Sequence, residues 1–241
     1  MFGLDPASWY ALVAITVLGA CFQGSVGFGL SFTIVPFLSV FEPVAIPTVP
    51  LLVAIPLLVA TVYHDFSHLD ARGSAWIVLG RLPGTLVGGI LLVLISPQLL
   101  AIMVGVLLLA SVVTSSTGMS LRLSRGTQLG AGFASGVMGT AAGLGGPPIS
   151  MVYRDESAAT MRATTGTALF VGVFMSMTAV FLTHRWDTSH VALAASLLPA
   201  SAVGFLLSRV VNRHLSKAVL QRVVLTLAAV AGVGSIAQAL L

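Results

Sequence analysis

Two glycine-rich stretches carry the residue types that are best suited to bind a small anion. The first runs from Gly24 to Ser31 and the second from Gly139 to Pro148, and each lies between apolar segments. Glycine permits positive φ and close approach of the backbone, while Pro147 and its neighbour lack the amide hydrogen that a helix needs. We therefore expect each stretch to break a helix, and the half-helix after it to point free N–H groups at a ligand.

Arg81 is the one charge that we expect inside an apolar segment. An arginine within the membrane is a candidate for function, and its guanidinium fits a sulfonate or a carboxylate. The alternative, that its long side chain reaches the headgroups, stays open. The Asp and Glu residues all fall at segment ends or in loops, so we expect no cation site and no carboxylate proton relay at mid-membrane.

Neutral donors beside the two breaks complete the candidate site. Small polar residues also let membrane helices pack closely, and this alternative stays open for each single Ser or Thr. We expect no cofactor and no metal site, because Cys21 is the only cysteine and no ligand cluster accompanies it. The candidate substrate-binding residues are Gln23, Ser25, Gly27, Gly29, Ser31, Thr48, Arg81, Thr140, Gly143, Gly145, Gly146 and Thr164.

The composition indicates an all-α integral membrane protein. Hydrophobic residues make up 57% of the 241 residues and charged residues only 7%, which leaves too little polar surface to cover a soluble globule. The net charge of +4 contains no cluster that could follow a nucleic-acid backbone, so we expect the lipid bilayer and a small anion as partners, and no nucleic acid.

A shift of 116 residues relates the two glycine-rich stretches and predicts an internal duplication. We expect a first repeat at residues 1–118 and a second at 119–241. Like residues coincide under this shift: Gly27 with Gly143, Gly29 with Gly145, Thr48 with Thr164, and Pro83 with Pro199. The apolar segments fall at about 8–23, 27–41, 44–64, 74–95 and 98–117, and then at about 127–142, 143–153, 160–183, 189–209 and 217–241.

The basic residues decide how the broken segments cross the membrane. If each broken stretch crossed once, Lys and Arg would divide about evenly between the two sides. If each stretch returns to its own side, ten of the eleven basic residues fall on one side and only Arg185 on the other. The positive-inside rule favours the second arrangement, which places both termini outside and turns the second repeat upside down.

Inverted repeats with interrupted helices are typical of secondary transporters, whose sites lie near the midplane. The same breaks also fit a passive anion channel, and Ser25 as the nucleophile of an intramembrane hydrolase is a weaker third hypothesis. Re-entrant hairpins and short full spans have the same parity, so both stay open. Glycines such as Gly84, Gly88 and Gly89 could pack within the protomer or against a second protomer in a homodimer.

The repeated element resembles that of the sulfite exporter TauE/SafE family, also called the 4-toluenesulfonate uptake permeases. The resemblance rests on residues 27–36 and 143–152, and on a second repeated feature at 83–89 and 199–204. It implies a transporter rather than an enzyme, in the cytoplasmic membrane of a bacterium or archaeon. It further implies that the protein moves sulfite, sulfonates or related organic anions.

The charge count generates a direct test of topology. Cysteines introduced as Arg122→Cys and Arg185→Cys should react with a membrane-impermeant thiol reagent from opposite sides of the membrane. Labelling of both positions from the same side would contradict the arrangement with returning stretches.

Overall fold

The computed structural model describes residues 5–118, 120–184, 187–214 and 217–240, and within these ranges it contains helices and no strands. Six of the helices, namely α1, α3, α4, α5, α8 and α9, are long and apolar enough to cross a membrane. The elements are α1 (Pro6–Val26), α2 (Ser31–Phe41), η1 (Pro43–Ala45), α3 (Thr48–Asp65), η2 (Phe66–His68), α4 (Ala71–Leu94), α5 (Pro97–Ser116), α6 (Arg125–Ala142), α7 (Gly146–Val152), α8 (Ala158–Leu182), α9 (Thr188–His214) and α10 (Lys217–Leu240). The expected all-α membrane architecture is confirmed.

Both glycine-rich stretches interrupt helices, as the sequence predicts. α1 ends at Gly27, which adopts a left-handed φ of 92°, and α6 ends at Gly143 with a φ of 73°. The helices that follow have 11 residues in α2 and 7 in α7. At 1.5 Å per residue both are too short to cross a hydrocarbon core of about 30 Å, so each second arm covers only part of that thickness.

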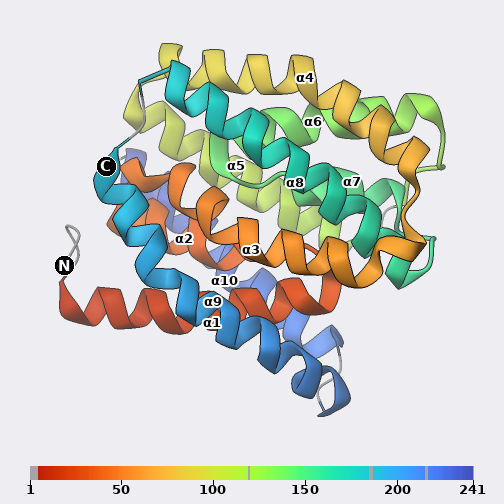
Figure 1. The fold of residues 1–241 in the computed structure, drawn as a ribbon. Coiled ribbons are helices and arrows are strands. Elements are labelled where there is room, and N and C mark those ends of the chain that lie inside the picture. Colours follow the sequence, from red (N-terminus) through yellow and green to blue (C-terminus); the bar gives the residue numbers. More distant parts are fainter. Residues whose placement is uncertain (1–4, 119, 185–186, 215–216, 241) are drawn as a thin grey trace.

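Several helix pairs in one half of the chain correspond to pairs in the other half (Figure 1). α4 packs along α6, and α9 packs in the same way along α1; α3 contacts α8 and α9, while α8 contacts α3 and α4. Figure 1 also shows that α1 and α3 run toward one end of the bundle, whereas α6 and α8 run toward the other. An inverted duplication requires such contacts and directions; the division into repeats at residues 1–118 and 119–241 stays a prediction.

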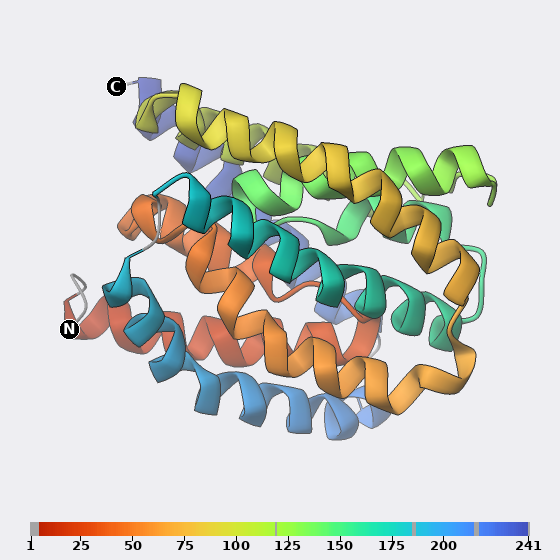
Figure 2. The same cartoon turned by 45° about the horizontal axis from the view of Figure 1, so that its top comes forward.

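Several helix ends that carry basic residues lie at one end of the bundle, which we call the basic end (Figure 2). The α3–α4 and α7–α8 connections lie at that end, and α1 begins and α10 ends at the opposite end. Arg72 in the first turn of α4, Arg125 at the start of α6 and Arg154 between α7 and α8 therefore share one end. Arg185, the expected exception, lies outside the described residues.

Glycines bring α4 and α6 into backbone contact. A Cβ on Gly80 or Gly84 would collide with main-chain atoms of Leu129 or Phe133 on α6. A Cβ on Gly132 would likewise collide with main-chain atoms of α4. These glycines therefore pack within the protomer, which is one of the two roles that the sequence left open, and they hold α4 against α6 as one unit.

This close packing makes a stability prediction. Gly84→Ala should lower the stability of the protein in detergent by about 1–3 kcal/mol, because the added methyl group forces α4 away from α6. Gly130→Ala on α6 is the matched control, since nothing lies within 4 Å of a Cβ at that position. Thermal unfolding followed by gel filtration measures both, and equal melting temperatures for the two variants would contradict the interpretation.

Candidate functional site

The two helix breaks meet at one cavity, which we call the central cavity. It has a volume of about 40 Å³ and is lined by both breaks and by side chains of α3, α4 and α8. A water molecule needs roughly 10–15 Å³ on this measure, so the space suits a small ion or a few waters. From the breaks come Phe28, Gly29 and Ser31, and Gly143, Leu144, Gly145, Gly146 and Pro147.

The breaks end their helices with the same hydrogen bond. The N–H of Gly27 donates to the carbonyl of Gln23 at 2.7 Å, and the N–H of Gly143 donates to the carbonyl of Gly139 at 3.0 Å. Only glycine adopts these left-handed positions without strain, so the sequence dictates where α1 and α6 stop. The two ends occupy equivalent positions in the two halves of the chain.

Free backbone amides contribute less to the cavity than the sequence suggests. The N–H of Leu30 donates to Gln23 Oε1 at 3.2 Å, and the N–H of Phe32 donates to the Gly29 carbonyl at 2.9 Å. In α7, Pro147 and Pro148 have no N–H to offer. The positive character of the cavity must therefore come mainly from a side chain.

Arg81 supplies that positive charge. It extends from α4 and is only 1% exposed, so the side chain is buried in protein and does not reach the headgroups. Its Nη1 donates to the hydroxyl of Ser135 on α6, and that hydroxyl donates to the carbonyl of Gly145 in the second break. Among the described residues, no carboxylate lies within ion-pairing distance of the guanidinium.

Three glycines leave the space that the guanidinium fills. A Cβ on Gly139 would lie 3.0 Å from Arg81 Nη2, and one on Gly145 would lie 2.9 Å from Nη1. A Cβ on Gly172 of α8 would collide with the guanidinium carbon itself. The glycines of α6, α8 and the second break thus determine where the charge can sit.

Two hydrogen-bond donors in the cavity wall lack a partner. Arg81 Nε and Gln23 Nε2 are buried and make no hydrogen bond, and both residues line the central cavity. Gln23 is 3% exposed, and its Oε1 is already used by the Leu30 amide. Buried donors are rarely left unpaired in proteins, so these two are candidates to donate to a bound acceptor.

Seven of the twelve residues that the sequence singled out line the central cavity, and five do not. Those in the wall are Gln23, Gly29, Ser31, Arg81, Gly143, Gly145 and Gly146. Those outside it are Ser25, Gly27, Thr48, Thr140 and Thr164.

The five residues outside the cavity are buried elsewhere. The Ser25 hydroxyl donates to the Cys21 carbonyl at 2.9 Å, and Thr140 Oγ1 lies 2.9 Å from Ser176 Oγ. The Thr164 hydroxyl accepts from the backbone N–H of Asp70 at 3.2 Å. The Ser25 bond stays within α1, whereas the Thr140 and Thr164 contacts join α8 to α6 and to the start of α4. The latter is the packing role that the sequence left open for single Ser and Thr residues. 

Thr48 and Gly27 are the other two residues outside the cavity. Thr48 is buried at the start of α3 and its hydroxyl has no partner.

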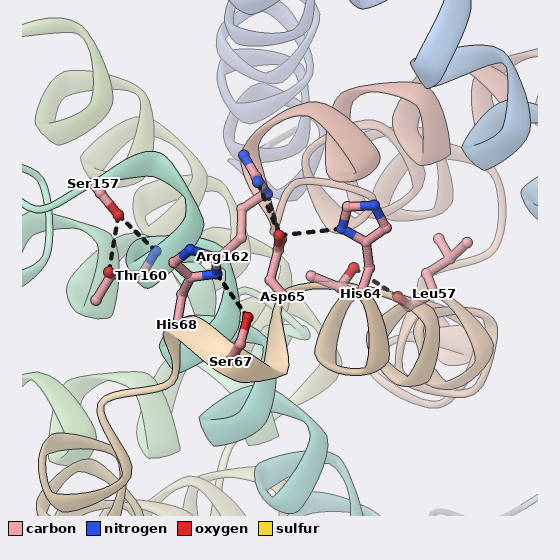
Figure 3. A network of polar contacts seen from close by, with 9 residues as sticks. Leu57, His64, Asp65, Ser67, His68, Ser157, Thr160 and Arg162 are labelled. Carbon is pink, nitrogen blue, oxygen red and sulfur yellow. Dashed lines mark hydrogen bonds and ion pairs between the residues drawn. The ribbon is translucent and has the colours of Figure 1, made fainter.

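Gly27 contacts a second polar cluster at the basic end, shown in Figure 3. Arg162 of α8 donates to both carboxylate oxygens of Asp65, at 2.7 and 3.1 Å, and His64 Nδ1 lies 3.2 Å from the same carboxylate. A Cβ on Gly27 would lie 2.7 Å from the Arg162 Cγ. The ion pair therefore joins α3 to α8 directly beside the first break.

Ser135, Gly139 and Gly172 surround the guanidinium but are not among the residues that the sequence predicts for the site. Ser135, Gly139 and Gly143 are spaced four residues apart on α6 and at its end, so they share one face of that helix. That spacing was readable in the sequence. The contribution of Gly172 was not, because it depends on how α8 crosses α4.

A larger side chain in the second break should prevent a small anion such as sulfite from binding in the central cavity. Gly145→Leu would place its side chain against Arg81, Ser135 and Leu169, and so fill the central cavity while leaving the lipid-facing surface unchanged. Gly130→Leu on α6 adds the same side chain where there is open space. Sulfite-dependent thermal stabilisation of the purified variants measures the difference, and a normal response from Gly145→Leu would contradict the assignment.

Comparison with known families agrees with this description. Residues 12–235 match the family model described as sulfite exporter TauE/SafE. Neither the search of curated proteins nor the search of solved structures produced a match. Because the matched range includes both breaks, Arg81 and nearly all of the remaining chain, this protein belongs to the sulfite exporter TauE/SafE family of membrane transporters.

Proposed function

We propose that this protein is a secondary transporter that moves small sulfur-containing or organic anions, such as sulfite and sulfonates, by alternating access at the central cavity. The observation that carries the proposal is Arg81, a buried cation with no carboxylate partner among the described residues, in the wall of the central cavity. Membership of the family supports the same class of substrate.

The energetics of a buried charge favour an anionic ligand. An ion that loses its water costs several kcal/mol unless a counter-charge and hydrogen bonds compensate it. Ser135 satisfies one N–H of Arg81, which leaves most of that cost uncompensated. An oxyanion between Arg81 and Gln23 would supply the missing negative charge and accept from both unpartnered donors.

The dimensions of the cavity favour small oxyanions in this conformation. At about 40 Å³ the space accommodates a compact anion such as sulfite, whereas an aromatic sulfonate needs a larger one. The walls beyond the polar groups are apolar, with Leu51, Leu169 and Val173 among them. Sulfite or a short-chain sulfonate, whose small body tolerates such walls, is the substrate that we propose.

The arrangement of the helices supports alternating access over a passive channel. The two breaks contribute to one cavity from two halves that run in opposite directions, which is how inverted-repeat transporters build a site. A hydrolase has less support, because the Ser25 hydroxyl donates to a backbone carbonyl and lies outside the cavity. We propose the cytoplasmic membrane of a prokaryote as its location, with the basic end inside and both termini outside.

Removing the cavity charge tests this proposal. Arg81→Gln should raise the KM for sulfite by about tenfold to a hundredfold, because hydrogen bonds to a charged group contribute about 1.5–3 kcal/mol. Arg72→Gln changes an exposed arginine on the same helix and should leave KM unchanged. Initial rates of labelled sulfite uptake into proteoliposomes, measured over a range of concentrations, give both values.

Two outcomes would count against the proposal. An Arg81→Gln variant with the wild-type KM would remove Arg81 from the site. Flux that rises linearly without saturation or counterflow would favour the channel.

A further inference from the structure

A second cavity, which we call the vestibule, lies next to the central cavity. Its volume is about 200 Å³, and its polar wall consists of Ser115 near the end of α5, Ser150 on α7 and Arg154 in the α7–α8 connection. The α7–α8 connection lies at the basic end of the bundle, where α3 also meets α4 (Figures 1 and 2). The vestibule therefore lies toward the basic end of the bundle.

Phe28 and Phe32 separate the two cavities. Both residues line the central cavity and the vestibule, and their ring centroids are 6.3 Å apart. Both side chains are buried, Phe28 at 8% and Phe32 at 2% exposure. A ligand that passed from one cavity to the other would have to pass these two rings.

Phe28 is held in a way that permits movement. It lies within the first break, between Gly27 with a φ of 92° and Gly29 with a φ of 136°. Its ring packs on Gly146 in the second break, where a Cβ would lie 2.6 Å from the ring. Phe32, in contrast, is part of the helix α2, which fixes its backbone. Glycines on both sides give the backbone at Phe28 a freedom that the helix denies to Phe32.

Arg154 gives the vestibule a preference for anions. Its side chain is exposed, and no carboxylate among the described residues lies within ion-pairing distance of it. The neighbouring Asp155 and Glu156 do not line the vestibule. A guanidinium at the mouth of a water-accessible hollow attracts small anions and raises their local concentration.

We infer that the vestibule is an outer anion subsite, and that Phe28 is the gate between it and the central cavity. This inference rests on the proposed function, because it assigns a path to the anion that Arg81 binds. In the conformation described, the gate is closed. Movement of the ring away from Gly146 would join the two cavities and give the anion access to Arg81 from the basic end.

The gate can be tested by cysteine labelling, without any measurement of transport. In a Cys21→Ala background, Ala54→Cys places a thiol in the wall of the central cavity and Ser150→Cys places one in the vestibule. An anionic methanethiosulfonate is applied to vesicles from the side that labels Arg122→Cys. With Phe28 present, the vestibule thiol should react readily and the central thiol slowly.

Phe28→Ala should then accelerate labelling of the central thiol by about tenfold or more, because the closed state loses a packed ring worth a few kcal/mol. The rate at Ser150→Cys should not change. Leu225→Ala is the control, since that buried side chain lines the vestibule but not the central cavity and comes from α10, away from both breaks. Phe28→Leu retains a bulky side chain and should accelerate labelling much less.

The charge of the vestibule has its own test. Arg154→Gln should slow the reaction of Ser150→Cys with the anionic reagent several-fold, and leave its reaction with a neutral thiol reagent unchanged. Equal slowing with both reagents would assign Arg154 a structural role and overturn the subsite.

The outcomes separate the gate from the proposed function. A folded Phe28→Ala variant without acceleration, or an equal acceleration in Leu225→Ala, would overturn the gate even if Arg81→Gln impairs sulfite uptake. Acceleration specific to Phe28→Ala would support the gate even if sulfite were not the substrate.

Discussion

A buried arginine without a carboxylate partner is the constraint around which this molecule is built. Arg81 lies at 1% exposure on a helix that spans the bundle, where an uncompensated charge is costly. The chain offsets part of that cost with the Ser135 hydroxyl and leaves room for the guanidinium with glycines on three sides. Under the proposed function, an anionic ligand offsets the rest of that cost.

The two halves of the chain contain similar helix breaks, but they differ in the charged residues beside them. Their helix ends at Gly27 and Gly143 are formed alike, and the α1–α9 pair corresponds to the α6–α4 pair. The position that corresponds to Arg81 under the shift of 116 residues is Leu197, which is fully buried. The fold thus brings two helix breaks together, while a single half supplies the charge. Among the described residues, an Asp–Arg ion pair, Asp65–Arg162, lies next to the first break and none lies next to the second.

Sequence reasoning succeeded where one helix contains the whole signal. Glycine and proline marked both helix breaks, and the position of Arg81 well inside an apolar segment identified it as a candidate. Whether its side chain is buried or extends to the headgroups depended on its neighbours in the fold. Sequence reasoning failed where the answer depends on contacts between helices. Thr140 and Thr164 flank the right segments, yet packing turns their hydroxyls toward Ser176 and Asp70. Gly172 gave no local signal, because its role exists only where α8 meets α4.

Glycine contacts form two closely packed helix pairs in the bundle, and each pair contributes a different residue to the central cavity. α4 and α6 are held backbone to backbone, and α1 and α9 form the equivalent pair, in which a Cβ on Gly204 would collide with the main chain at Val17. Arg81 belongs to the first pair and Gln23 to the second. An anion that both residues bind would link the α4–α6 pair to the α1–α9 pair. Binding and release of the anion would therefore strengthen and weaken the contact between the two pairs.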